Sequence, residues 1–143
     1  MIELGRLGSG EIVVDRPRSH LDDPTVVGLL PEALAQVDSD EQDFIVQEVD
    51  LGREVGETIC VATKPGDKIR FFYRPGRDGP TRFVIGRKPE PCSAMTLVLK
   101  KARSNLYILV TAYIGYKAEP EPWDRNATEA SQGFWAKHAL VLT

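Results

Sequence analysis

One of the chain's two histidines, His138, lies in the C-terminal stretch TAYIGYKAEPEPWDRNATEASQGFWAKHAL, residues 111–140. Histidine has an ordinary pKa of about 6.5, so it can take up and release a proton near neutral pH. Tyr113, at the exit of the strand that opens this stretch, is a second group that could transfer protons. His20 lies in a polar loop and has a weaker claim. The competing interpretation makes His138 a hydrogen-bonded core residue on the inner face of a helix.

Cations and aromatic rings alternate in the segment KIRFFYRPGRDGPTR, residues 68–82. Successive side chains of a strand point to opposite faces. The two predicted faces are therefore Arg70, Phe72 and Arg74, and Ile69, Phe71 and Tyr73. A face that mixes arginine with an aromatic ring suits phosphate contacts and base stacking. Arg74, Arg77 and Arg82 bracket the turn, where their guanidinium groups could converge on a phosphate.

Each of these features also has a structural interpretation. Phe72 could be half buried beneath the aliphatic stems of neighbouring arginines. The arginines could form salt bridges with the acidic N-terminal segment. In the Pro-Trp-Asp motif, Trp123 would pack a loop on the core and Asp124 would cap a turn, so that the stretch works as a clamp.

The sequence lacks the motifs that are typical of several classes of enzyme and metal site. The chain contains no GxSxG motif, no P-loop, no GxGxxG motif and no carboxylate cluster with metal-ligand spacing. Cys60 and Cys92 have neither a CxxC spacing nor a matching Cys/His cluster, so we expect packed, reduced thiols and no zinc site. We therefore expect no metal and no cofactor.

Charge is unevenly distributed along the chain. Residues 64–103 hold eleven basic and three acidic side chains, although the formal net charge of the whole chain is −3. Residues 1–43 hold ten acidic and three basic side chains. This asymmetry indicates an anionic partner, or an acidic segment that lies near the basic hairpins and neutralises them.

Length and composition favour one globular domain over residues 1–143. The first residues lack the pattern of a signal peptide, and no later stretch reaches about 20 apolar residues. We therefore predict a cytoplasmic protein that does not bind a membrane.

The pattern of strands and turns predicts an α+β fold. Residues 1–43 form an acidic segment with a short helix over 31–37, started by Pro31 at its first position. Residues 44–143 form an antiparallel meander of five to seven strands, built from three successive hairpins, and a C-terminal helix. The strand over 106–113 is apolar on both faces, which is typical of the middle of a sheet covered on each side. The C-terminal helix, over 126–140 with Asn126 as N-cap, and the short N-terminal helix pack on that sheet.

Two resemblances add to this reading. With RPGRDGPTRFVIGR ahead of it, the C-terminal stretch resembles a bacterial family of unassigned activity, in which a Thr-Ala-Tyr strand end is followed by Pro-Trp-Asp and a Phe-Trp-x-x-His-Ala-Leu helix. More loosely, a sheet with a Thr-Ala-Tyr strand end and basic neighbouring strands is similar to the barnase, RelE and colicin group of metal-independent ribonucleases. Members of that group are often toxins, which implies RNA as substrate and an antitoxin-like protein as partner.

The ribonuclease resemblance implies cleavage by the 2′-hydroxyl of the RNA itself. That reaction needs a proton acceptor, a proton donor and cations for the phosphorane. The candidate catalytic residues are His138, Tyr113 and Arg74. The candidate substrate-binding residues are Arg70, Phe72, Arg82 and Thr111. The alternative is a non-catalytic module whose basic sheet face docks nucleic acid or an acidic protein.

Overall fold

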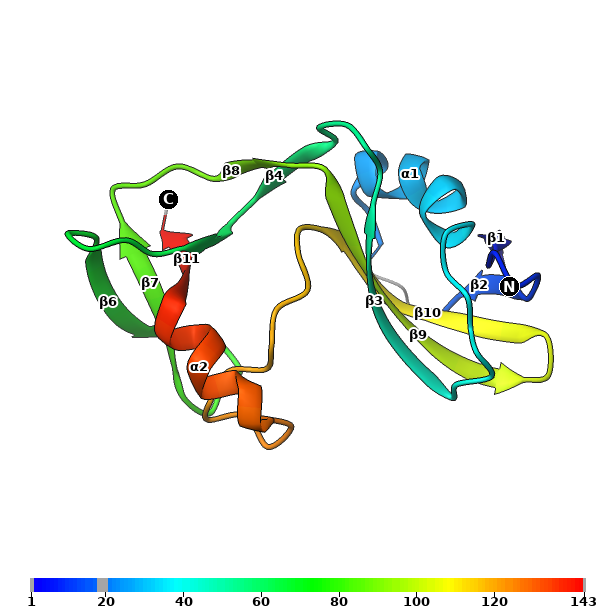
Figure 1. The fold of residues 1–143 in the computed structure, drawn as a ribbon. Coiled ribbons are helices and arrows are strands. Elements are labelled where there is room, and N and C mark those ends of the chain that lie inside the picture. Colours follow the sequence, from blue (N-terminus) through cyan, green and yellow to red (C-terminus); the bar gives the residue numbers. More distant parts are fainter. Residues whose placement is uncertain (1, 18–20, 143) are drawn as a thin grey trace. The chain divides into compact units, whose positions relative to one another are not determined.

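The computed structural model describes residues 2–17 and 21–142 of the chain, so His20 lies outside the described residues. Its internal contacts divide into two compact units (Figure 1). The first unit consists of residues 1–56 and 92–117, and the second of residues 57–91 and 118–143. The described residues form eleven strands and two helices, an α+β fold as predicted but with more strands than expected.

The first unit contains a five-stranded sheet in the order β1-β2-β10-β9-β3. Its strands are β1 (Glu3–Arg6), β2 (Ile12–Asp15), β3 (Phe44–Asp50), β9 (Ala94–Arg103) and β10 (Leu106–Ile114). The predicted hairpin of β9 and β10 is confirmed, and β10 lies at the centre of the sheet as expected. β2 pairs with β10 in parallel, so the prediction of a purely antiparallel sheet is wrong.

Helix α1 (Pro24–Leu34) covers one face of this sheet. Asp23 is its N-cap and accepts a hydrogen bond from the backbone N–H of Thr25, while Pro24 occupies the first turn. Proline is favoured there because its missing N–H would have no partner in the helix. The prediction of a helix starting at Pro31 is wrong, since Pro31 lies inside α1.

The core of the first unit forms between α1 and the inner face of the sheet. Leu30 and Leu34 of α1 pack there with Leu97 and Leu99 of β9. A bulge between Leu109 and Thr111 shifts the side-chain alternation of β10. The acidic segment 1–43 thus supplies two strands, a helix and core residues to the first unit.

The second unit contains a four-stranded sheet in the order β5-β11-β7-β6. Its strands are β5 (Cys60–Ala62), β6 (Lys68–Tyr73), β7 (Pro80–Ile85) and β11 (His138–Leu142). β6 and β7 form the predicted hairpin, whereas β7 pairs with β11 in parallel. The sheet is therefore mixed as well.

Helix α2 (Glu129–Lys137) belongs to the second unit and runs directly into β11. Its N-cap is Thr128, which forms a capping box with Ser131, so the prediction of Asn126 as N-cap is wrong. The predicted extension to residue 140 is also wrong, because the apolar run from His138 pairs with β5 and β7. α1 contacts β10, as predicted for the N-terminal helix, whereas α2, which was expected to cover the same sheet, contacts β11 within the second unit.

A further two-stranded sheet consists of β4 (Gly56–Thr58) and β8 (Glu90–Cys92). Of the three predicted hairpins, the first in the chain, which paired residues 44–52 with residues 57–63, is wrong because β3 pairs with β9 and β5 pairs with β11. Among the described residues, no helix is long and apolar enough to cross a membrane.

If the chain is a single domain, as predicted, its two units should unfold together in one cooperative transition. The two tryptophans allow a test. Trp123 and Trp135 both belong to the second unit, so their fluorescence reports on that unit alone. Leu97→Ala removes a fully buried side chain of the first unit and should lower the free energy of unfolding by about 2–5 kcal/mol. We expect the thermal midpoint seen by tryptophan fluorescence to fall together with that seen by circular dichroism. A fluorescence midpoint that stays at the wild-type value would mean that the units unfold independently.

Candidate functional site

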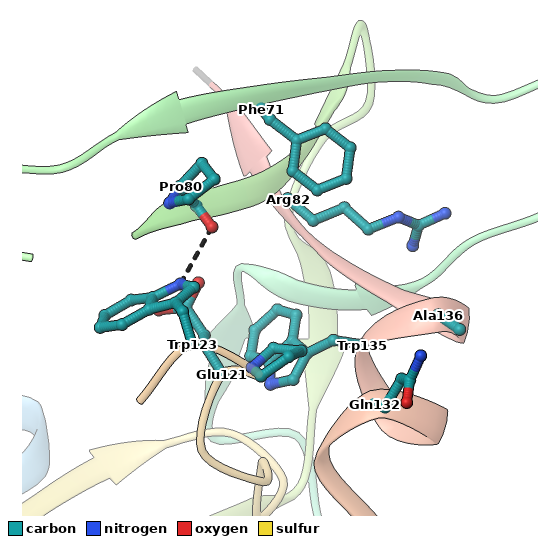
Figure 2. A pocket seen from close by; sticks show the side chains of 9 residues that line it. Phe71, Pro80, Arg82, Glu121, Trp123, Gln132, Trp135 and Ala136 are labelled. Atoms are coloured by element: carbon teal, nitrogen blue, oxygen red, sulfur yellow. Dashed lines mark hydrogen bonds between the residues drawn. The ribbon is translucent and has the colours of Figure 1, made fainter. Parts of the chain in front are cut away.

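A pocket of about 370 Å³ opens in the second unit, between β6, β7, α2 and the loop before α2 (Figure 2). Three aromatic side chains line it, namely Phe71, Trp123 and Trp135. The polar side chains at the pocket are those of Arg82, Glu121 and Gln132. Its volume lies at the lower end of the range that binds small molecules, about 300–1,000 Å³.

The loop carrying Trp123 is held against β7 by two features. The indole N–H of Trp123 donates to the carbonyl of Pro80 at 3.0 Å (Figure 2). The ring also lies over Gly79, where an added Cβ would come within 2.2 Å of the Trp123 Cγ. Gly79 is therefore required by close approach and not by backbone conformation.

Trp135 projects from α2 into the core of the second unit, where it packs with Phe83 and Leu140 and is 7 % exposed. Its indole N–H donates to the carbonyl of Glu119 at 2.7 Å. Trp135 thus ties the helix to the loop that precedes it. This arrangement agrees with the clamp interpretation of the C-terminal stretch.

Arg74 is engaged in internal bonds. Its Nη2 lies 2.7 Å from the Oε2 of Glu121, and its Nε donates to the hydroxyl of the buried Thr81 at 3.0 Å. The Glu121 side chain is only 10 % exposed. Because this carboxylate neutralises the guanidinium, Arg74 has little capacity left to stabilise charge on a substrate.

Arg82 is held differently. Its Nη1 donates to the carbonyl of His138 at 2.8 Å and to the hydroxyl of Thr63 at 3.2 Å. Both acceptors are neutral, so these bonds orient the guanidinium without cancelling its charge. Across the hairpin, Arg82 is the partner of Phe71, whereas Arg70 is opposite Phe83. The three predicted substrate-binding residues of this hairpin therefore lie on different faces of the sheet, Arg82 on one face and Arg70 and Phe72 on the other.

His138 ends α2 and begins β11. Its ring stacks on Phe134, with ring centroids 4.0 Å apart, and its Nδ1 lies 2.9 Å from the Phe134 carbonyl oxygen. A carbonyl oxygen can only accept a hydrogen bond, so Nδ1 must carry the proton. In the neutral ring, Nε2 is then the nitrogen that can accept a proton.

β6 is an edge strand with three consecutive exposed aromatic side chains. Phe71 is 60 % exposed, Phe72 45 % and Tyr73 71 %. Lys68 and Arg70, on the same strand, are exposed as well. Arg70 donates only to the carbonyl of Ile69, its neighbour in the chain, so its charge faces solvent.

The remaining candidates, Thr111 and Tyr113, lie on β10 in the first unit. The candidate set is thus divided, because His138, Arg70, Phe72, Arg74 and Arg82 all belong to the second unit. Sequence reasoning missed Glu121 and Gln132 as pocket residues and gave Phe71 no role. The Pro-Trp-Asp motif was the sequence signal that pointed to this loop.

Two further observations describe the chemistry near the pocket. Burial raises the pKa of the Cys60 thiol to about 11, and the negative charge of Glu121 adds to the shift. The thiol is therefore protonated at neutral pH. Within residues 2–17 and 21–142, no three His, Cys, Asp or Glu side chains gather closely enough to hold a metal ion.

Comparison of the chain with protein-family models, with curated proteins and with solved structures finds no match. The two resemblances seen in the sequence therefore stay predictions.

Gly79→Ala should displace the Trp123 ring, because the new methyl group overlaps it. We expect the free energy of unfolding to fall by about 1–3 kcal/mol and the tryptophan emission to shift to longer wavelength. The matched control is Gly133→Ala in α2, where an added Cβ meets nothing within 4 Å. That substitution should instead stabilise the protein by about 0.5–1 kcal/mol. Equal destabilisation by both would contradict the proposed packing of Trp123.

Arg74→Ala should leave the poorly exposed Glu121 carboxylate without its partner. A fully buried pair loses about 3–5 kcal/mol when one partner is removed, and the exposed third of Arg74 reduces this to about 1–3 kcal/mol. Arg70→Ala is the control and should change the free energy of unfolding by less than about 0.5 kcal/mol. Chemical denaturation of both variants tests the assignment. Equal stability of the two would show that the ion pair has no structural role.

Proposed function

We propose that the second unit binds single-stranded nucleic acid, with RNA as the natural ligand, along the edge strand β6. The observation that carries the proposal is the run of three exposed aromatic side chains, Phe71, Phe72 and Tyr73, beside exposed cations. Large exposed apolar groups rimmed by charge are typical of interaction sites.

The aromatic rings supply stacking surfaces. Stacking of a base on an aromatic side chain contributes about 1–3 kcal/mol and does not depend on which base is present. The rings are not needed to fill the core: Phe72 contacts Phe83, with ring centroids 5.9 Å apart, yet it stays 45 % exposed. Because the side chains of β6 alternate between the two faces, bases could stack on either side of the strand edge.

The cations supply attraction to phosphate. Lys68, Arg70 and Arg77 are all exposed near these rings. The second unit has ten basic and eight acidic residues, whereas the first has eight basic and thirteen acidic residues. Nucleic acid would therefore be attracted to the second unit more strongly than to the first.

Metal-independent RNA cleavage is a second candidate function, and the observation that favours it is the 2.9 Å contact between His138 Nδ1 and the Phe134 carbonyl oxygen. With Nδ1 bonded to the Phe134 carbonyl, Nε2 is able to accept a proton, as a general base requires. The pairing of Arg74 with Glu121 favours binding over cleavage, because it neutralises the cation predicted to stabilise the phosphorane. Recovery of intact RNA from the binding assay, with chelator present, distinguishes the two functions.

Phe72→Ala should weaken binding of a fluorescently labelled oligouridine by about 5- to 150-fold, because one stacking surface is lost. Arg70→Ala should weaken binding less and should lower the slope of log K against log salt by about 0.7. Fluorescence anisotropy at several salt concentrations measures both effects.

Phe44→Ala is the matched control, since Phe44 is a phenylalanine of the first unit that is 56 % exposed. It should leave the affinity unchanged. The proposal fails if the wild-type protein does not bind the oligonucleotide at low salt, or if Phe44→Ala weakens binding as much as Phe72→Ala. In the first case, an acidic protein becomes the expected occupant of β6.

A further inference from the structure

The aromatic pocket of the second unit has walls whose hydrogen-bonding groups are already satisfied. Both indole N–H groups donate to backbone carbonyls, that of Trp123 to Pro80 and that of Trp135 to Glu119. The partly exposed Trp123 ring and the small exposed part of the Trp135 ring therefore offer a ligand apolar surface only. Such walls suit a flat ring that gains from contact area.

The charge around the pocket decides which kind of ring fits. Aromatic pockets often bind organic cations, especially beside a carboxylate. Here the Glu121 carboxylate is already paired with Arg74, whereas Arg82 bonds only to the neutral oxygens of His138 and Thr63. Within the described part of the chain, no acidic side chain is paired with Arg82. The pocket therefore carries an uncompensated positive charge, which disfavours a cation and favours an anionic ligand.

The pocket also has a side chain that can form hydrogen bonds with the polar edge of a bound ring. Gln132 lies on α2 at the pocket, is exposed, and makes no side-chain hydrogen bond to any other described residue. An amide can both donate and accept hydrogen bonds, as the edge of a nucleobase does. Figure 2 shows Gln132 and Trp135 on one side of the pocket, with Phe71 and Arg82 on the other.

Phe71 connects the pocket to the edge strand. It lies on β6, where it is 60 % exposed, and it also lines the pocket. A single strand that stacks along β6 thus passes the pocket entrance.

We propose that the pocket binds one unstacked base of that strand, with Trp123, Trp135 and Phe71 around the ring and Arg82 near the phosphate of the same nucleotide. This inference rests on the proposed function and adds a site to it. A mononucleotide should then bind by itself, although more weakly than the strand.

The protein contains an internal probe for this site, since its two tryptophans both line the pocket. Adenosine or uridine monophosphate should quench the tryptophan fluorescence in a saturable manner, and ribose 5-phosphate, which lacks the base, should not. Equal quenching by ribose 5-phosphate would overturn the base pocket, because the phosphate alone would then be recognised.

Ala136→Leu should block the pocket, because Ala136 lines it from an exposed position of α2 where leucine is a good helix former. We expect the dissociation constant for the mononucleotide to rise roughly tenfold or more, with the thermal midpoint unchanged. The matched control is Ala130→Leu, the same substitution at an exposed position of α2 that does not line the pocket. It should bind as the wild type does. Gln132→Ala is a second variant that should weaken mononucleotide binding by removing the amide.

Parallel titrations with labelled oligouridine separate the two proposals. If the oligonucleotide binds and depends on Phe72 while no mononucleotide quenches the tryptophans, the base pocket is overturned and the proposed function stands. If neither ligand binds, both fail. Weaker oligonucleotide binding by Ala136→Leu, with Ala130→Leu unaffected, supports the pocket as part of the nucleic-acid site.

Discussion

The second unit depends on the direct junction between α2 and β11. Lys137 ends the helix and His138 begins the strand, so no loop residues are present to satisfy the last carbonyls of the helix. Residues outside the helix do so instead. Thr63 donates to the carbonyl of Lys137 through both its backbone N–H and its hydroxyl, and the side chain of His138 bonds to the carbonyl of Phe134. Arg82 donates to the next carbonyl, that of His138. These bonds fix α2, and with it one wall of the pocket, on the sheet.

Two arginines chosen for their chemistry have structural partners, and Arg82 has its partner at this junction. A guanidinium group that matches a phosphate also matches a carboxylate or a pair of carbonyl oxygens. Arg74 meets a carboxylate 47 residues away, and Arg82 meets a carbonyl 56 residues away. Sequence patterns cannot distinguish these uses, because the deciding acceptor is remote in the chain. The side chains that keep free surface are those of β6, where the edge of the sheet leaves them exposed.

The parts of the fold that were predictable from sequence are local. Two hairpins with short connections, β6–β7 and β9–β10, and the central place of β10 follow from alternation and turn residues. The parallel pairs β2–β10 and β7–β11 were missed because each joins strands remote in sequence. For the same reason the end of α2 was misplaced: His138–Leu142 fits a helix pattern by itself and becomes a strand by pairing with β5 and β7. For the candidate site, the sequence alone pointed to the hairpin of cations and aromatic rings over residues 68–82. The ion pair of Arg74 with Glu121 could not be predicted, because it is a contact between residues remote in the chain.

Hydrogen bonding and charge compensation act separately in this unit, and that separation leaves the pocket with apolar ring surface and one cation that no acidic side chain of the described residues pairs with. Both tryptophans use their N–H groups to fix their positions, and the partly exposed Trp123 keeps ring surface open to the pocket. Nη1 of Arg82 donates to two neutral oxygens at the junction. These bonds orient the guanidinium without compensating its positive charge. The charge of Arg74 is compensated by Glu121, and this ion pair fixes the loop that carries Trp123. A nucleotide bound as proposed would find both apolar ring contact and a positive charge already in place, so little conformational entropy would be lost on binding.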